Sequence, residues 1–452
     1  MARINIDFGK KLGTVKPMHA VNNGPVYKFA VDQRITNIDA YRDAGIPYAR
    51  NHDASFCSTY GGEHTVDVHN IFTNFDADPY LPSSYDFAMT DEYIKVCEFA
   101  GVRTFYRLGS KIEHGIKKYG TLPPKDFAKW AVICEHIIRH YTEGWADGFN
   151  YDIEYWEIWN EPDLDPDDST HKRCWGGTAA QFYELYCVAH KHLKACFPHL
   201  KIGGPAVAGL RPEWLDGFFN ALNKNGIVPD FFSWHRYDKD PRRLVEKVRY
   251  ARELLDKYGF SETESILNEW NYVRGWTGDD WEYTLKSEKN IKGASYIAAV
   301  IESCQYEPLD MLMYYDARPS GMNGMFSTDR ICDKLKGYYP IYMFNQLYVL
   351  DRAVEVLTDD EDFYACAAVG EREAAVMITH YSDDDEKGSA EVEVDLKSFG
   401  ADAGSAIEYY LLDAAHDLEL VGKATYYGER FTPSFTMPNL SSYLIKIKKV
   451  YE

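Results

Sequence analysis

The chain has 452 residues, room for one large domain and one smaller one, because single hydrophobic cores stop growing at about 250–300 residues. Its formal net charge of −21 comes from 49 basic and 70 acidic residues, and this negative field opposes binding to nucleic acid and to anionic lipid headgroups. A neutral small molecule or glycan is therefore the favoured partner, and the aromatic share of 15% offers flat rings that suit sugars.

An N-terminal strand is expected at residues 2–8, and it needs a sheet to join. No apolar signal region precedes it, and no apolar run reaches the roughly 18 residues of a membrane span. The nine cysteines are odd in number, scattered and without a C-x-x-C pair. This pattern favours free thiols over disulfides or a zinc site. We expect a cytoplasmic protein without a cofactor or a metal.

Strands and helices are expected to alternate through residues 13–350. The predicted strands are 14–21, 46–53, 102–108, 155–162, 200–205, 230–237, 265–271 and 309–316. The predicted helices are 35–42, 91–100, one opening at Pro123, 178–197, 214–222, 240–258, 287–304 and 340–350. This alternation is typical of an α/β (β/α)8 TIM barrel. No glycine-rich phosphate motif follows any strand, which argues against a nucleotide site.

The pattern changes in residues 351–452. Short alternating segments are separated there by acidic or glycine turns, which predicts a C-terminal β-sandwich that residues 1–12 join. The acidic run at 383–388 is expected to be a solvated hairpin tip. The irregular stretch 54–89 is expected to wall the active site, since ordered loops of this length are usually functional.

Two of the predicted barrel strands end in a carboxylate beside an aromatic residue. Residues 155–162 read Tyr-Trp-Glu-Ile-Trp-Asn-Glu-Pro, and residues 265–271 read Ser-Ile-Leu-Asn-Glu-Trp-Asn. In one parallel barrel, Glu161 and Glu269 would open onto the same C-terminal face. Glycosidic bond cleavage needs one carboxylic acid to protonate the leaving oxygen and one carboxylate facing the anomeric carbon. We therefore predict a retaining glycoside hydrolase with Glu161 as acid/base and Glu269 as nucleophile.

Three strand-end motifs resemble glycoside hydrolase clan A, most closely family 39, the family of β-xylosidases and α-L-iduronidases. They are Trp-Asn-Glu-Pro at 159–162, Ser-x-His-x-Tyr at 233–237 and Glu-Trp-Asn at 269–271. The resemblance extends over nearly the whole chain, including the N-terminal strand and the β-sandwich. It implies a β-xylosidase-like enzyme in which Asn160 hydrogen-bonds the sugar 2-OH and Tyr237 steadies Glu269.

Other strand-end side chains are candidates for substrate contact or for support of the carboxylates. Trp159, Trp270 and Tyr315 could stack on a sugar or merely pack. Glu157 lies deeper on the face of Glu161 and is expected to pair with Arg50 or Arg107 as a buried ion pair. The substrate-binding candidates are Asn160, His235, Tyr237, Trp159, Trp270, His52, Arg50, Arg107, Tyr315 and Arg318.

Two further functions fit the same strand ends. One is the same chemistry on a uronic acid or on an arabinose or galactose side chain. A uronate needs basic partners for its carboxylate, and those on strand ends or loops are Arg50, Arg107, Arg274 and Arg318. The other is a carbohydrate-binding barrel without turnover. All three interpretations predict a carbohydrate partner and neither nucleic acid nor a membrane.

Overall fold

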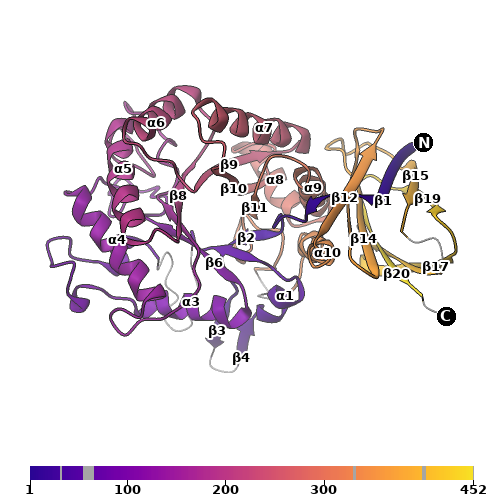
Figure 1. Ribbon diagram of the computed structural model, residues 1–452, viewed down its shortest axis with the longest axis horizontal. Coiled ribbons are helices and arrows are strands. Elements are labelled where there is room, and N and C mark those ends of the chain that lie inside the picture. The colour runs from indigo at the N-terminus through magenta and orange to yellow at the C-terminus, as the bar shows by residue number, and fades with distance from the viewer. Residues whose placement is uncertain (31–32, 54–65, 329–331, 400–403, 451–452) are drawn as a thin grey trace.

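The described part of the chain contains a closed barrel of eight parallel strands, a separate ten-stranded sheet and a small two-stranded sheet. The structure is a computed structural model that describes residues 1–30, 33–53, 66–328, 332–399 and 404–450. Figure 1 shows the sheet domain beside the barrel, with α9 (Ile291–Cys304) and α10 (Tyr338–Tyr348) at the junction. The predicted TIM barrel with a second β domain is confirmed.

The barrel closes in the order β10-β11-β2-β5-β6-β7-β8-β9. Its strands are β2 (Ala20–Asn22), β5 (Tyr48–Arg50), β6 (Arg103–Leu108), β7 (Tyr155–Ile158), β8 (Lys201–Val207), β9 (Phe231–Asp238), β10 (Glu264–Tyr272) and β11 (Met311–Tyr314). Every neighbouring pair is parallel. The carboxyl ends of all these strands therefore meet at one end of the barrel, as in other barrel enzymes.

The helices around the barrel differ from the prediction in several places, and α2 and η1 lie in the stretch expected to be irregular. They are α1 (Ile38–Asp43), α2 (Val68–Ile71), the 3-10 helix η1 (Pro82–Ser84), α3 (Ala88–Ala100), α4 (Phe127–Thr142), α5 (Ala179–Cys196), α6 (Pro212–Lys224), α7 (Pro241–Lys257) and α8 (Gly278–Glu288). A hairpin of β3 (Tyr27–Ala30) and β4 (Gln33–Thr36) precedes a shorter α1. Helix α4 starts after Asp126, which accepts the N–H of Lys129 as N-cap, and not at Pro123. Helix α8 was not predicted.

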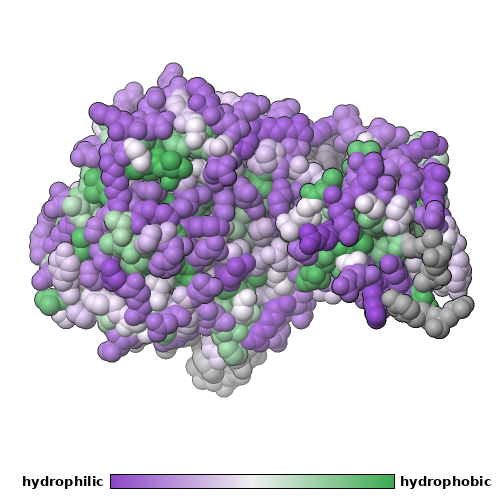
Figure 2. Space-filling view, viewed as in Figure 1, coloured by the Kyte–Doolittle hydropathy of each residue, from purple (hydrophilic) through white to green (hydrophobic). Residues whose placement is uncertain are grey.

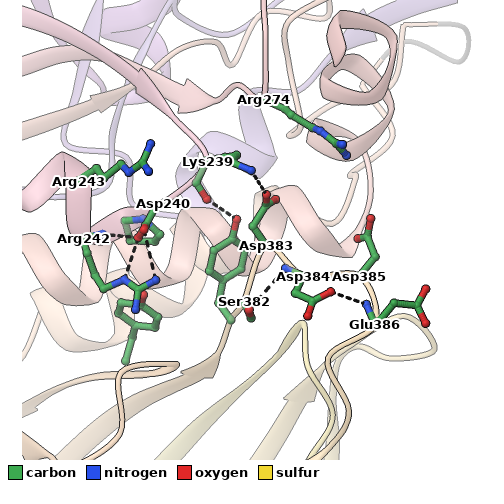
Figure 3. A pocket seen from close by; sticks show the side chains of 13 residues that line it. Lys239, Asp240, Arg242, Arg243, Arg274, Ser382, Asp383, Asp384, Asp385 and Glu386 are labelled. Atoms are coloured by element: carbon green, nitrogen blue, oxygen red, sulfur yellow. Dashed lines mark hydrogen bonds and ion pairs between the residues drawn. The ribbon is translucent and has the colours of Figure 1, made fainter. Parts of the chain in front are cut away.

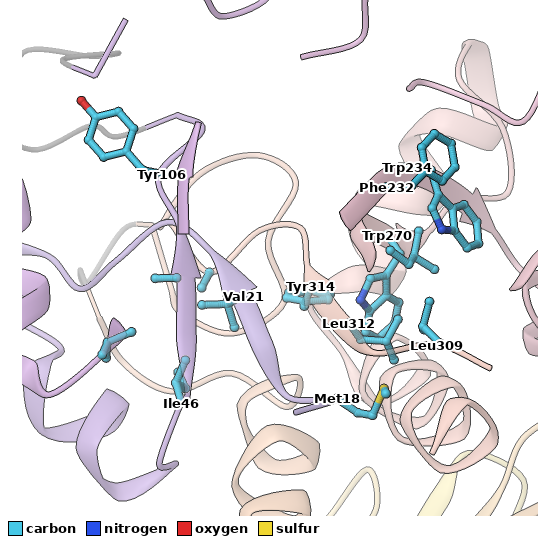
Figure 4. Close-up of a cluster of buried hydrophobic side chains, with 14 of the residues drawn as sticks. Met18, Val21, Ile46, Tyr106, Phe232, Trp234, Trp270, Leu309, Leu312 and Tyr314 are labelled. Carbon is cyan, nitrogen blue, oxygen red and sulfur yellow. The ribbon is translucent and has the colours of Figure 1, made fainter. Parts of the chain in front are cut away.

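Apolar side chains fill the barrel. One small cluster joins Phe105, Tyr155, Phe231, Ile266 and Met313 from five of its strands. A larger cluster lies between strands and helices, and Figure 4 shows part of it. The packed interior leaves no room for a ligand inside the barrel. A binding site is therefore expected at the carboxyl ends of the strands.

The second domain is one continuous sheet in which the N-terminal strand takes part. β1 (Ala2–Thr14) lies between β12 (Arg352–Thr358) and β15 (Ala390–Lys397). The other strands are β13 (Phe363–Val369), β14 (Glu373–His380), β16 (Ser405–Leu412), β17 (Asp417–Tyr426), β18 (Arg430–Phe431), β19 (Ser434–Met437) and β20 (Ser441–Lys449). Phe435 of β19 packs against Tyr409 and Tyr443, so the two halves of the sheet face each other across a second core.

The acidic run after β14 is exposed at residues 384–388, as predicted for a solvated tip, but Asp383 at its start is docked on the barrel. Asp383 Oδ2 lies 2.8 Å from Lys239 Nζ, and Asp383 Oδ1 accepts the hydroxyl of Tyr272 at 2.7 Å. Figure 3 shows Lys239 and Asp383 facing each other. Lys292 of α9 is only 4% exposed and donates to the Asp383 carbonyl and to Asp385 Oδ1, each at 2.7 Å. The turn thus joins the sheet domain to the carboxyl ends of β9 and β10.

We expect Asp383→Asn to lower the free energy of unfolding by roughly 1–3 kcal/mol, because the buried Lys292 ammonium loses a charged partner. Urea unfolding followed by tryptophan fluorescence measures the loss. The matched control is Asp384→Asn, whose side chain is exposed and accepts the Glu386 N–H; its expected effect stays within about 0.5 kcal/mol. Equal effects of the two substitutions would show that the docked turn contributes nothing to stability.

Hydrophilic residues dominate the face shown in Figure 2, and hydrophobic residues form separate patches on it. Among the helices of the described residues, none combines the length and the apolar character needed to cross a bilayer.

Candidate active site

Glu161 lies three residues beyond β7, which ends at Ile158 and is shorter than predicted. Trp159 and Glu161 have φ angles of +79° and +47°, a left-handed conformation that is uncommon for residues other than glycine. The turn is held by the Glu161 N–H, which donates to the carbonyl of Ala206 at 2.8 Å. It sends the Trp159 indole into the surrounding core and the Glu161 carboxyl towards β9. Such local strain is typical of functional sites.

Glu269 lies at a β-bulge inside β10. Leu267 pairs with Trp234 of β9 and Glu269 pairs with His235, so Asn268 is an extra residue on the β10 side. A bulge re-aims the side chains that follow it and is common beside active sites. Here it turns the Glu269 carboxyl towards β9.

The two glutamates meet at His235. Its Nδ1 lies 2.9 Å from Glu161 Oε1 and 3.3 Å from Glu269 Oε2. An oxygen of Glu161 and an oxygen of Glu269 lie within 4.8 Å of each other. Burial lowers the pKa of His235 to about 4, so the imidazole is neutral near pH 7. It therefore orients both carboxyl groups without adding a charge between them.

Burial also changes the acidity of the two carboxyl groups. It raises the pKa of Glu161 to about 7, and Arg50 opposes the shift. Burial raises the pKa of Glu269 as well, against the attraction of His235 and Arg50. Arg50 Nη1 lies 2.7 Å from Glu269 Oε1, and the Tyr237 hydroxyl donates to Glu269 Oε2 at 2.9 Å. These donors favour ionised Glu269, whereas Glu161 is readily protonated at neutral pH.

Arg50 connects the carboxylates of the barrel. Besides Glu269, it donates through Nε to Glu157 Oε2 at 2.7 Å and through Nη2 to Asn160 Oδ1 at 2.6 Å. A buried ion pair of Glu157 with Arg50 or Arg107 was expected, and its partner is Arg50. Glu157 Oε1 also accepts the hydroxyl of Ser233 at 2.6 Å. Arg50 is fully buried and thus fixes the nucleophile candidate from below.

We expect Arg50→Met to lower the free energy of unfolding by about 3–5 kcal/mol, since it leaves two buried carboxylates without their cation. Arg249→Met is the control. Arg249 is 61% exposed and pairs with Glu307 at 2.6 Å, and loss of such a surface pair costs about 0–1 kcal/mol. Chemical unfolding of both variants measures the difference. If the Arg50→Met protein were as stable as the Arg249→Met protein, this result would contradict a structural role of Arg50.

Arg107 and His52 form a separate network beside Arg50. Arg107 pairs with Asp67 rather than with Glu157, and its Nε donates to His52 Nδ1 at 3.2 Å. His52 Nε2 lies 3.9 Å from Glu269 Oε1. Burial holds the pKa of His52 well below its usual range. Arg107 is fully buried, so it supports His52 and the strand ends instead of facing a ligand.

Tyr315 and Arg318 follow β11 and contact residues next to the two glutamates. The Tyr315 hydroxyl donates to Asp53 Oδ2 at 2.6 Å, and its ring meets Tyr237 edge-on with centroids 6.3 Å apart. Arg318 lies 3.1 Å from Asp316 and 3.5 Å from Asp53. Tyr315 is partly exposed, so it borders both the site and solvent.

Trp159 and Trp270 do not offer a face to a sugar, which corrects the stacking role predicted for them. They are 1% and 0% exposed. Trp159 packs against Trp130 and Trp175, and Trp270 against Tyr296 and Tyr314. Figure 4 shows Trp270 and Tyr314 inside the core. The left-handed turn at 159 and the bulge before 269 direct these side chains inward.

Two residues near the carboxylates, Asn22 and Cys174, were missed by sequence reasoning. Asn22 Oδ1 accepts from Arg50 at 3.1 Å, and its Nδ2 donates to the carbonyl of Asn268 at 2.7 Å. Asn22 is the last residue of the first barrel strand, and a strand-end position could have marked it as a site residue. The sequence reasoning instead placed it in the turn that follows the strand. Cys174 Sγ lies 3.8 Å from Glu161 Oε2, and no motif in the sequence links these two residues.

Two side-chain groups in the described ranges bring possible metal ligands within 4.8 Å of one another: Glu161 with His235 and Glu269, and Glu135 with His192 and Cys196. An arginine already accompanies each group. Arg50 lies 2.7 Å from Glu269, and Arg139 lies 2.8 Å from Glu135. This positive charge opposes the addition of a metal cation at either place.

Known proteins match both the sequence and the fold. The family model for "Glycosyl hydrolases family 39" matches residues 16–271. A β-xylosidase of Geobacillus stearothermophilus is 26% identical over 216 residues, 45% of this chain and 40% of the relative. A β-xylosidase of Caldicellulosiruptor saccharolyticus is 26% identical over 251 residues, 53% and 46% of the two chains. The match thus spans less than half the length of either relative.

Solved structures share the whole two-domain arrangement. A glucosidase from Croceicoccus marinus has a TM-score of 0.80 at 22% identity, with both chains fully covered. A monomeric β-xylosidase from Caulobacter crescentus has a TM-score of 0.71 at 16% identity, again over both full chains. At these identities the likeness establishes the fold alone.

Proposed function

The chain belongs to glycosyl hydrolase family 39, and on this premise we propose that it is a retaining glycosidase acting on β-linked sugars, with β-xylosides as its substrate class. One observation carries the proposal: carboxyl oxygens of Glu161 and Glu269 lie within 4.8 Å of each other. Retaining enzymes hold their two carboxyl groups about 5–5.5 Å apart, whereas inverting enzymes need about 6.5–9.5 Å to admit a water. The β-xylosidase relatives support the choice of sugar.

In the first step, the Glu269 carboxylate attacks the anomeric carbon while Glu161 gives its proton to the leaving oxygen. The bond from the anomeric carbon to that oxygen breaks, and a glycosyl ester forms on Glu269. The raised pKa of Glu161, about 7, keeps a proton available at neutral pH. Arg50 and Tyr237 hold Glu269 ionised and aimed before the attack.

In the second step, Glu161 acts as a base. It takes a proton from a water that attacks the anomeric carbon, and the ester bond to Glu269 breaks. Esterified Glu269 carries no charge, so Glu161 ionises more easily in this intermediate than in the free enzyme. Two inversions leave the product with the anomeric configuration of the substrate.

Asn160 and Tyr315 are the side chains we assign to the sugar. The Oδ1 of Asn160 accepts from Arg50, which directs its amide N–H groups away from the arginine, as the donor to a 2-OH requires. Tyr315 is partly exposed beside Tyr237 and offers a ring edge and a hydroxyl. His52, His235 and Arg318 complete the surrounding polar wall.

A uronic acid substrate has less support. Each arginine considered for its carboxylate has an acidic partner within the described residues. The pairs are Arg50 with Glu157 and Glu269, Arg107 with Asp67, Arg274 with Asp280, and Arg318 with Asp316 and Asp53. A sugar carboxylate would have to compete with these ion pairs.

Assays on nitrophenyl glycosides test the proposal. The β-D-xyloside is compared with the β-D-glucuronide, the α-L-arabinofuranoside and the β-D-galactoside, and NMR identifies the first anomer released. We expect the highest kcat/KM on the β-D-xyloside and the β anomer as first product. Release of the α anomer would refute the retaining mechanism. Binding of xylo-oligosaccharides without any product would favour a non-catalytic barrel.

A further inference from the structure

Trp276 is an exposed aromatic residue beside the catalytic centre. It is 56% exposed. All ten tryptophans of the chain lie in the described residues, and the other nine are buried or partly buried. Its ring meets the ring of Tyr237 at 79°, with centroids 5.1 Å apart. Tyr237 in turn donates to Glu269. Only one side chain therefore separates this open indole from the proposed nucleophile.

The segment that carries Trp276 is held in place. It connects β10 to α8, so it lies at the carboxyl end of the barrel, where active-site loops are found. The Arg274 N–H donates to Thr284 Oγ1 at 3.0 Å, and the Arg274 guanidinium lies 2.9 Å from Asp280 Oδ1. Figure 3 shows Arg274 next to the helix that follows. Trp276 itself stacks on Trp281, with centroids 5.6 Å apart and planes 24° apart.

This arrangement fixes the Trp276 indole without burying it. Trp281 covers part of the ring and Tyr237 touches it edge-on, yet more than half of Trp276 stays in water. Exposure of a large apolar ring is unfavourable, and a pre-oriented aromatic face loses little conformational entropy when a ligand covers it. The C–H face of a pyranose is flat and apolar and matches such a ring.

We propose that Trp276 is a stacking platform for a sugar ring of the substrate, at the edge of the centre formed by Glu161 and Glu269. The inference rests on the proposed glycosidase function and adds a binding residue to it. Trp159 and Trp270 are buried, so Trp276 takes the place of the two tryptophans that the strand-end motifs suggested. Its contact with Tyr237 also couples ring binding to the group that steadies the nucleophile.

The test compares Trp276→Ala and Trp276→Phe with the control Tyr427→Ala. Tyr427 is 74% exposed and lies in the sheet domain. KM and kcat are measured for xylotriose and for nitrophenyl β-D-xyloside. We expect Trp276→Ala to raise the KM for xylotriose about tenfold, the equivalent of one lost aromatic stack. Phenylalanine should restore most of the affinity, kcat should change less than KM, and Tyr427→Ala should change neither constant.

Binding without turnover separates this inference from the proposed function. Xylotriose is titrated into the Glu269→Gln protein and into the same protein carrying Trp276→Ala, with the heat of binding measured by calorimetry as the signal. A saturable change that disappears with Trp276 supports stacking, even if the wild-type protein cleaves no glycoside. An unchanged KM together with an unchanged titration in the Trp276 variants would overturn the inference and leave the glycosidase proposal intact.

Discussion

Glu269→Ala is expected to lower kcat on nitrophenyl β-D-xyloside by at least about 10⁴-fold, the scale seen when a covalent nucleophile is removed. The reason is local. Arg50 and Tyr237 hold one carboxylate in place, 2.7 and 2.9 Å away, and no other group in the described part of the chain accepts hydrogen bonds from both. In the alanine variant Arg50 and Tyr237 remain, but neither can form the covalent bond to the anomeric carbon.

Azide distinguishes a lost nucleophile from a damaged fold. The alanine leaves space for the anion next to Arg50, so azide should restore turnover and give the α-glycosyl azide, the product of a single inversion. The control is Glu264→Gln, which changes a carboxylate at the other end of β10 that contacts Lys201 and Tyr155. An undiminished rate for Glu269→Ala, or equal losses for both variants, would remove Glu269 from the mechanism.

The carboxylate pair was predictable because strand ends in a parallel barrel converge. The apolar runs ending near 161 and 269 assigned both glutamates to one face without any knowledge of distance. The same two-residue alternation predicted a buried arginine partner for Glu157, and the structure decides for Arg50 over Arg107. The sequence pattern therefore predicted to which face of the strands these polar side chains point.

Local backbone departures limited the prediction. Alternation cannot anticipate the positive φ angles at 159 and 161 or the extra residue at 268, and these decide that Trp159 and Trp270 point into the core. Trp276 was overlooked because it stands in a connecting segment without a strand pattern. Part of the stretch expected to wall the site, residues 54–65, lies outside the described residues; the rest includes α2 and η1.

Contacts between distant segments were also out of reach. The run at 383–388 is acidic, and an acidic turn is usually solvated. Its partners Lys239, Tyr272 and Lys292 come from three different barrel elements. Only the fold brings them to one place, so composition could not reveal that Asp383 docks on the barrel.

Glu161→Gln is expected to slow hydrolysis most for substrates whose leaving group needs a proton. Loss of a general acid costs about 10²–10⁴-fold, and xylobiose, with a poor leaving group, should show the full effect. A dinitrophenyl β-D-xyloside needs no proton, so its first step should proceed and the glycosyl ester on Glu269 should accumulate as a burst. Steady-state and stopped-flow measurements on both substrates separate the two steps.

The pH profile tests the same assignment independently. The first step needs protonated Glu161, whose pKa is about 7, so wild-type kcat/KM for xylobiose should fall as the pH rises through 7. Glutamine does not titrate, and the variant should lose this alkaline limb while keeping the acidic one that ionisation of Glu269 sets.

Azide should rescue Glu161→Ala with the β-glycosyl azide, opposite to the product of Glu269→Ala. Because the two rescued anomers differ, exchanged products would show that the acid/base and the nucleophile had been interchanged.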